Sequence, residues 1–374
     1  MDYRTLGLVL IVLALLGSAS IVASLLQRQS VPGMDPLILD KFCSRLRGWW
    51  LFLSLVAAAM LLGNGVVVFL FGGMSFWAMR EFITLTPTRP ADHRPLFLVF
   101  FICIPLQFLL VWLELYDVYS VLIPTYVFLL IPIFMAIFGD TKRYLERVAQ
   151  ISAALLICVY CLSYAPALLT LESRPEEVPS PTSAVEAAAV SESVAEGAAR
   201  GSASLSGVEN AATGAGLLCF FLLMTQLTEI FQYVSLQFVP TQHCIAPSIN
   251  TSRTWEGLAT SCLGVMLAGT LLYWATPFPF WLAGIMSFVI AVMSFGGSLT
   301  LSAIKRDRGV RDYGTLVVGH GGILDRIDTI CFSAPIFFHL TKMYLYFATA
   351  ATPGDVTAML FSWLMLYSTL GIDN

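Results

Sequence analysis

Residues 48–79 read GWWLFLSLVAAAMLLGNGVVVFLFGGMSFWAM and contain no Asp, Glu, Lys or Arg. As one α-helix, these 32 residues would extend ~48 Å. That length exceeds the ~30 Å hydrocarbon core of a bilayer. Gly63-Asn64-Gly65 lies at the centre of the stretch, where a tight turn is expected. The stretch therefore predicts two short membrane-spanning helices joined by a turn.

Further apolar runs of spanning length lie along the rest of the chain, near residues 5–27, 95–113, 118–139, 149–170, 214–238, 258–277, 280–303 and 329–350. Hydrophobic residues make up 57% of the chain and charged residues 12%, whereas about 25% of residues in an average soluble domain are charged. This composition excludes a soluble protein. It predicts an all-α, polytopic integral membrane protein with about ten transmembrane helices.

The basic residues of the loops indicate the orientation of these helices. Three loops each hold at least three Lys or Arg, namely residues 28–47, 80–94 and 140–148. Because short cytoplasmic loops are enriched in Lys and Arg, these three loops should share the cytoplasmic side. They do so only if residues 48–79 form two spans, and the amino terminus then lies outside.

The two ends of the chain leave alternatives open. The run at 5–27 is longer than the apolar part of a usual signal peptide and lacks a convincing small-x-small cleavage site. We therefore interpret it as a retained first span. Residues 354–371 form a final apolar stretch of marginal length, which is either an eleventh span or a helix in the membrane interface.

A polar segment divides the chain into two membrane halves. Residues 171–213 are rich in Ala, Ser, Glu, Pro and Gly and contain no aromatic residue, so they cannot bury enough apolar surface to fold. They predict an acidic extracytoplasmic loop that is disordered or loosely helical. The loop separates an N-terminal half, residues 1–170 with about six spans, from a C-terminal half, residues 214–374 with about four spans and the final apolar segment.

The C-terminal half contains a dense array of charges, SAIKRDRGVRDYGTLVVGHGGILDRID, from Ser302 to Asp328. Carboxylates suit Mg²⁺, basic side chains suit phosphate oxygens, and glycines allow close backbone approach. The array therefore predicts a metal-assisted phosphoryl site, with a His-Gly-Gly turn and the charged residues Lys305, Arg306, Arg308, Arg311, Asp312, Asp325, Arg326 and Asp328.

On a helix that begins near Leu324, Asp325 and Asp328 would share one face and hold one or two ions. The alternative is a cytoplasmic loop whose acids only balance its bases. The formal net charge of −4 offers no basic excess that would point to nucleic acid.

Two further polar features belong to the same half. Thr254 is expected to cap the helix that follows it, with Trp255 as an interface anchor. Glu229 lies inside a predicted span between Gln226 and Gln232. A carboxylate at that depth costs about 2.5 to 3.5 kcal/mol, which favours a functional role over a neutral buried acid.

The array resembles the signature of the phosphatidate cytidylyltransferases, S-x-x-K-R, four residues, K-D-x-G, and then H-G-G-x-x-D-R-x-D. Ile249 to Gly257 is similar to the family segment I-S-P-K-K-T-W-E-G. Arg311 and Val318 replace a usual lysine and proline, and Glu229 stands where the family often has Asp. In the second segment, the usual S-P-K is replaced by Asn250, Thr251 and Ser252. The signature positions matched here are Ser302, Lys305, Arg306, Asp312, Gly314, His320, Gly321, Gly322, Asp325, Arg326 and Asp328.

The resemblance implies transfer of CMP from CTP to phosphatidic acid, with release of pyrophosphate. It implies Mg²⁺, as one ion or two, bound by Asp312, Asp325, Asp328 and Glu229. The implied catalytic residues are Asp312, Lys305, Arg306, Arg311, His320 and Arg326, and the implied substrate-binding residues are Ser302, Arg253, Thr254, Gly321 and Gly322. The site would face the cytoplasm at a bacterial inner membrane, and the protein would be a homodimer.

Two other functions remain open from the sequence. A CTP-dependent lipid kinase would use the same nucleotide but transfer its γ-phosphate to an alcohol. A transporter or a non-catalytic membrane scaffold would also explain the spans, and its best support is His339 and Lys342, one helical turn apart inside the last long run.

Overall fold

The structure is a computed structural model that describes residues 36–85, 89, 92–138, 142–171, 214–239, 243–310 and 322–350, with six single positions between 7 and 21. Most of the first apolar run, nearly all of the acidic loop and the final apolar stretch lie outside the described residues. The expectations for those segments, and the domain division that rests on them, stay predictions.

The predicted break in residues 48–79 is confirmed. Helix α2, Pro36–Leu62, ends directly before Gly63, and helix α3, Asn64–Thr84, begins directly after it. Gly63 has a φ of 120°, which a residue with a side chain rarely adopts. The expectation of a loop over residues 28–47 is wrong for its second part, because α2 already begins at Pro36. Proline is favoured at the first helical position, and no further Pro or Gly follows before Gly48.

The helical segments described between residues 93 and 170 are interrupted by π-helical turns. Helices α4 and α5 flank η2, α6 and α7 flank η3, and α8 and α9 flank η4 before a short η5. Each π turn contains or precedes a proline, Pro105, Pro124 or Pro166, which removes one helical N–H donor. The bounds are α4 His93–Leu98, η2 Val99–Cys103, α5 Ile104–Trp112, α6 Tyr116–Val121, η3 Leu122–Val127, α7 Phe128–Phe138, α8 Tyr144–Leu155, η4 Leu156–Cys161, α9 Leu162–Ala167 and η5 Leu168–Thr170.

In the described residues of the C-terminal half, 214–239, 243–310 and 322–350, four long helices accompany a small sheet that the sequence did not predict. Strands β1 and β2 pair antiparallel, with Cys244 opposite Thr254 and Ala246 opposite Asn250. The elements are α11 Gly214–Phe238, β1 Cys244–Ala246, β2 Asn250–Thr254, α12 Trp255–Leu271, η6 Tyr273–Ala275, α13 Phe280–Asp307 and α14 Leu324–Ala350.

The protein is an all-α integral membrane protein, as predicted. Among the residues that the structure describes, six helical segments are long and apolar enough to cross a bilayer, namely Asn64–Thr84, His93–Trp112, Tyr116–Ile137, Tyr144–Thr170, Gly214–Leu236 and Phe280–Asp307. Helices α2, α12 and α14 lie at further predicted runs, but none of the three meets the requirements of both length and apolar composition for a spanning helix. The count of ten spans stays a prediction.

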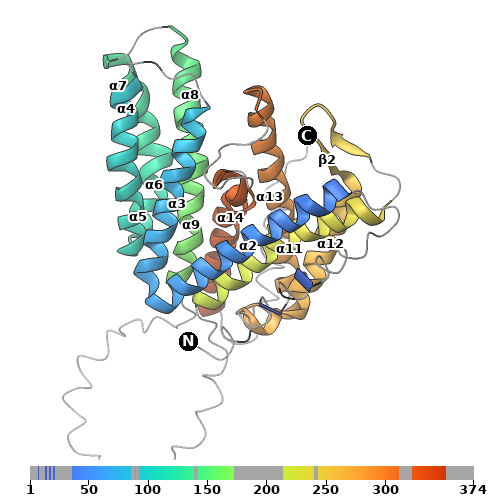
Figure 1. Cartoon of the computed structure of the whole chain (residues 1–374). Coiled ribbons are helices and arrows are strands. Elements are labelled where there is room, and N and C mark those ends of the chain that lie inside the picture. The colour runs from blue at the N-terminus through green and yellow to red at the C-terminus, as the bar shows by residue number, and fades with distance from the viewer. Residues whose placement is uncertain are drawn as a thin grey trace, which may run out of the picture.

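Helix α14 joins the two halves. Helices α3 to α9 form an upright bundle on the left of Figure 1, and α11 to α14 lie beside it. Helix α14 packs against α13 and α11 on one side and against α9, η4 and α3 on the other. Its side chains Ile327, Ile330 and Cys331 are fully buried. The amino end of α14 is therefore placed by contacts from both halves of the chain.

A buried ion pair joins the segment before α4 to the first turn of α8 in the N-terminal bundle. The Arg147 guanidinium lies 2.8 Å from the Asp92 carboxylate, and both side chains are almost fully buried. The second Asp92 oxygen accepts the Arg89 backbone N–H at 2.9 Å. Because removing one partner of a buried pair leaves an uncompensated charge, this contact fixes the start of α8 relative to the segment before α4.

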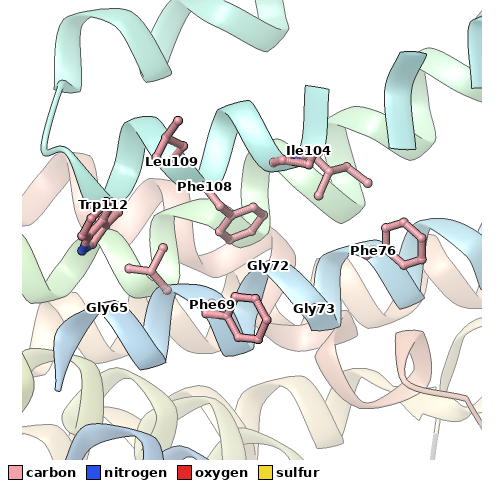
Figure 2. A pocket seen from close by; sticks show the side chains of 11 residues that line it. Gly65, Phe69, Gly72, Gly73, Phe76, Ile104, Phe108, Leu109 and Trp112 are labelled. Carbon is pink, nitrogen blue, oxygen red and sulfur yellow. The ribbon is translucent and has the colours of Figure 1, made fainter. Parts of the chain in front are cut away.

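An apolar groove of about 440 Å³ lies between α3 and α5. Figure 2 shows Phe69, Phe76 and Phe108 around it, with Trp112 at one end. Gly65, Gly72 and Gly73 of α3 also line it. All of its lining residues are apolar side chains or glycines, so the groove has none of the charged groups of the predicted phosphoryl site.

Candidate functional site

The site lies where the carboxyl end of α13 meets the amino end of α14. The Lys305 ammonium lies 2.6 Å from an Asp325 carboxylate oxygen, and the side chains are 17% and 16% exposed. The other Asp325 oxygen accepts the Gly322 backbone N–H at 3.3 Å. These contacts bring together three residues of the predicted site that are up to 20 positions apart.

Helix α14 begins at Leu324, as predicted, and places Asp325 and Asp328 on its first turns. Asp328 is buried, and one of its carboxylate oxygens accepts the Thr329 backbone N–H at 2.8 Å. A Cβ at Gly297 of α13 would overlap the Asp328 carbonyl oxygen. The two helices therefore approach closely at the level of the carboxylates because residue 297 has no side chain.

Strand β2 contributes a buried arginine to the same region. The Arg253 guanidinium donates a hydrogen bond to the Ser298 hydroxyl of α13 and lies 5.8 Å from the centre of the Phe295 ring. The Asn250 amide donates to the Ser302 hydroxyl at 3.3 Å. Ser302 in turn donates to the Ser298 carbonyl at 2.7 Å. Arg253 and Ser302 thus lie along one face of α13, as expected of residues in one site.

Two other basic residues of the predicted site contact distant segments of the chain. The Arg306 guanidinium donates to the Ile249 carbonyl at 3.0 Å and so holds the turn between β1 and β2. The Arg326 guanidinium packs against Gly48 of α2, where an added Cβ would overlap it. Both side chains have defined positions around the α13–α14 junction.

The predicted cap at Thr254 is confirmed. Its hydroxyl accepts the Gly257 backbone N–H at 3.0 Å, and its backbone is extended. Trp255 is 59% exposed, as expected of an interface anchor. The Glu256 carboxylate accepts the His243 backbone N–H at 3.0 Å and contacts its ring at 2.6 Å. The hydrogen bonds from the His243 side chain and backbone lower the pKa of Glu256 to about 2.

Glu229 lies on a buried polar face of α11, with Gln226 and Gln232 one turn away on either side. Among the described residues, no hydrogen-bond partner lies within reach of either polar atom of the Gln232 amide. Helix α11 packs against α12, α13 and α14. The polar face therefore belongs to the interior of the C-terminal half, as the sequence indicated.

Four of the predicted site residues, Arg311, Asp312, His320 and Gly321, lie outside the described residues. Within the described part of the chain, no three His, Cys, Asp or Glu side chains are grouped as a metal site. Mg²⁺ is commonly held by only one or two carboxylates together with substrate phosphates and water. The oxygen donors of Asp325 and Asp328 fit that pattern.

His339 and Lys342 have structural partners. The Lys342 ammonium lies 2.9 Å from the centre of the Tyr116 ring, and His339 contacts the Pro335 carbonyl at 2.6 Å. The His339 ring also lies 4.9 Å from the ring of Tyr164. These contacts favour a packing role and weaken the main support for a transporter.

Sequence reasoning missed the contact that Glu81 of α3 makes with the site. One of its carboxylate oxygens accepts the Ile323 N–H at 3.0 Å, and the other accepts the Leu324 N–H at 2.9 Å. Glu81 is only 5% exposed. An acid near the end of an otherwise apolar run was the available signal, but its partner lies more than 240 residues away along the chain.

Comparisons with known proteins identify the family of the chain. The model of the cytidylyltransferase family matches residues 43–344. The chain is 29% identical over 306 residues to the uncharacterized protein YnbB of Escherichia coli, and the match covers 81% of this chain and 88% of that protein.

Two phosphatidate cytidylyltransferases match a shorter part of the chain. The protein of Synechocystis is 38% identical over 99 residues, which cover 26% of this chain and 34% of its own length. The protein of Mycobacterium leprae is 33% identical over 128 residues, which cover 33% of this chain and 39% of its own length. This chain thus aligns with little more than a third of either protein.

The family match spans most of the described helices, from α2 to α14, and includes both the carboxyl end of α13 and the first turns of α14. The membrane helices, the charged junction and the comparisons therefore lead to one conclusion: the chain belongs to the cytidylyltransferase family, a family of nucleotidyltransferases.

Proposed function

We propose that the protein transfers CMP from CTP to phosphatidic acid, giving CDP-diacylglycerol and pyrophosphate. The observation that carries the proposal is the pairing of Lys305 with Asp325 at the α13–α14 junction. Buried Asp328 lies on α14, and buried Arg253 of β2 packs against α13. The names of the phosphatidate cytidylyltransferases that match the chain support the lipid phosphate as acceptor.

The reaction needs charge compensation more than a strong base. A phosphate oxygen of phosphatidic acid attacks the α-phosphorus of CTP, and the bond from that phosphorus to the bridging oxygen of the β-phosphate breaks. Pyrophosphate leaves with the electron pair. Because the lipid phosphate is already an anion, the main barrier is the approach of two anions and the departure of a third. Fixed cations lower such a barrier.

Lys305, Arg253 and Arg326 supply fixed positive charge around the junction, and Arg311 is assigned the same role from the sequence. Asp325 and Asp328, with Asp312 and Glu229, would hold Mg²⁺, which when bound supplies further positive charge at the phosphate oxygens of CTP. Asp325 also orients Lys305 through their 2.6 Å contact. His320 is assigned as a hydrogen-bond donor rather than as a base.

The membrane setting fits a reaction in which one substrate is a lipid and the other is soluble in water. We place the site at the cytoplasmic ends of α13 and α14, at a bacterial inner membrane, because the loops rich in Lys and Arg define that side. CTP then arrives from water, and phosphatidic acid arrives laterally from the bilayer. Exposed Trp255, beside the buried Arg253, is a side chain suited to the lipid headgroup level.

Labelled CTP separates this proposal from its alternatives. The purified full chain in lipid vesicles is incubated with Mg²⁺, CTP and phosphatidic acid or diacylglycerol. We expect the α-phosphate label to enter the lipid and the γ-phosphate label to appear in pyrophosphate. A lipid kinase would instead place the γ-label in lipid when diacylglycerol is supplied, and a transporter or scaffold would place neither label there.

A further inference from the structure

Glu81 is a buried carboxylate that the proposed reaction does not use. It lies near the carboxyl end of α3, in the N-terminal half, yet both of its oxygens accept hydrogen bonds from the backbone at the start of α14. The first N–H groups of a helix have no partner inside the helix. Glu81 therefore supplies an N-terminal cap to α14 from a distant part of the chain.

This cap constrains the helix more than a local cap would. Each oxygen of the Glu81 carboxylate takes one N–H, from Ile323 and from Leu324, so both the position and the rotation of the first turn are fixed. A negative charge is also favourable at the positive end of the helix dipole. Because α3 packs against α9 and α5, the carboxylate is anchored in the N-terminal bundle.

The residue at position 322 must be small for this arrangement to form. A Cβ on Gly322 would overlap the Glu81 carboxylate. The N–H of the same glycine donates to Asp325. Gly322 is thus enclosed between the Glu81 carboxylate and the Asp325 carboxylate, which explains the last glycine of the His-Gly-Gly turn.

We propose that Glu81 is a positioning residue of the transferase site. It holds the first turn of α14 in the orientation in which Asp325 faces Lys305, and it does so from the half of the chain that contains no signature residue. Its effect on turnover rests on the proposed function, whereas its effect on the geometry of α14 does not.

Hydrogen exchange at the start of α14 tests the geometry without reference to activity. In Glu81→Gln, an amide NH₂ replaces one acceptor and faces a backbone N–H. We expect exchange of the Ile323 and Leu324 amides to rise by about tenfold to a hundredfold, as for the loss of one hydrogen bond to a charged acceptor. Unchanged exchange in a folded Glu81→Gln protein would overturn the proposal.

A double-mutant cycle tests the contact between Glu81 and Gly322. Gly322→Ala alone places a methyl group against the carboxylate and should speed exchange at the start of α14. Glu81→Asp shortens the side chain by one methylene, so Gly322→Ala should cost less in that background. Additive effects would contradict the contact. Gly73→Ala on the same α3 helix is the matched control, because its Cβ would meet open space.

Kinetics then separate this role from general stability. In protein that remains folded, Glu81→Gln should lower kcat for CMP transfer by about tenfold or more, with a smaller change in the KM for CTP, because Glu81 acts on the reaction through the orientation of Asp325 toward Lys305. A kcat that does not change while exchange rises would limit Glu81 to structure and refute its positioning role. Absence of transfer in the wild-type protein would instead refute the proposed function, and the exchange experiments would still decide the geometry.

Discussion

Replacing Asp325 with Asn tests the charged centre of the site with little change in shape. Asp325 contacts Lys305 at 2.6 Å and accepts the Gly322 N–H, and its side chain is only 16% exposed. Asn keeps the size but removes the charge that balances the largely buried ammonium. A hydrogen bond between charged groups contributes about 1.5 to 3 kcal/mol. The substitution removes that contribution and one carboxylate proposed to hold Mg²⁺.

The expected loss of kcat/KM for CMP transfer is about 10²-fold to 10³-fold, as for the removal of one preorganised electrostatic group. The assay is initial-rate formation of CDP-diacylglycerol at several Mg²⁺ concentrations. If the lost carboxylate binds the ion, high Mg²⁺ should restore part of the rate.

Asp307→Asn is the matched control, because Asp307 also lies near the end of α13 but its side chain is 70% exposed. Its rate should change less than about threefold, as surface charge pairs contribute little. A normal rate in Asp325→Asn, or equal losses in the two variants, would refute the assignment of Asp325 to the site.

Three further predictions concern the rest of the chain. Arg253→Met should lower kcat/KM by about tenfold or more, because Met has neither a donor for the Ser298 hydroxyl nor a positive charge beside the Phe295 ring, and steady-state kinetics measure it. Arg147→Met should reduce stability by about 3 to 5 kcal/mol, because it leaves Asp92 buried without its partner, and denaturant unfolding measures it. For Glu256, a pKa lowered to about 2 in the folded protein from 4.5 means that ionisation stabilises the fold above pH 4.5 and that this contribution is lost as the pH falls toward 2. The thermal midpoint of Glu256→Gln should therefore lie below that of the wild type at neutral pH and approach it near pH 2.

The elements that the sequence predicted correctly depend on short-range signals. The break at Gly63, the start of α14 at Leu324 and the cap at Thr254 each follow from residues within a few positions of one another. Local rules for turns and helix ends apply directly to such positions. The charged array was also recognisable locally, because its residues lie on the two adjacent helices α13 and α14 or between them.

The features that the sequence did not predict depend on long-range packing. Nothing near Glu81 indicates that it caps α14, and nothing near Gly48 indicates that Arg326 packs against it. The early start of α2 and the β1–β2 pair have weak local signals, because a polar helix end and a three-residue strand resemble loops in composition. Tertiary contacts decide such segments.

The central claim is that the lipid phosphate attacks the α-phosphorus of CTP at the α13–α14 junction, and isotope labelling tests it directly. Phosphatidic acid whose phosphate oxygens are ¹⁸O is incubated with the purified protein, CTP and Mg²⁺. The masses of the products are then measured by mass spectrometry. The account predicts that all of the ¹⁸O stays in CDP-diacylglycerol, including the oxygen that bridges the two phosphorus atoms, and that pyrophosphate carries none. Labelled pyrophosphate, or the absence of any labelled nucleotide-lipid product, would contradict it.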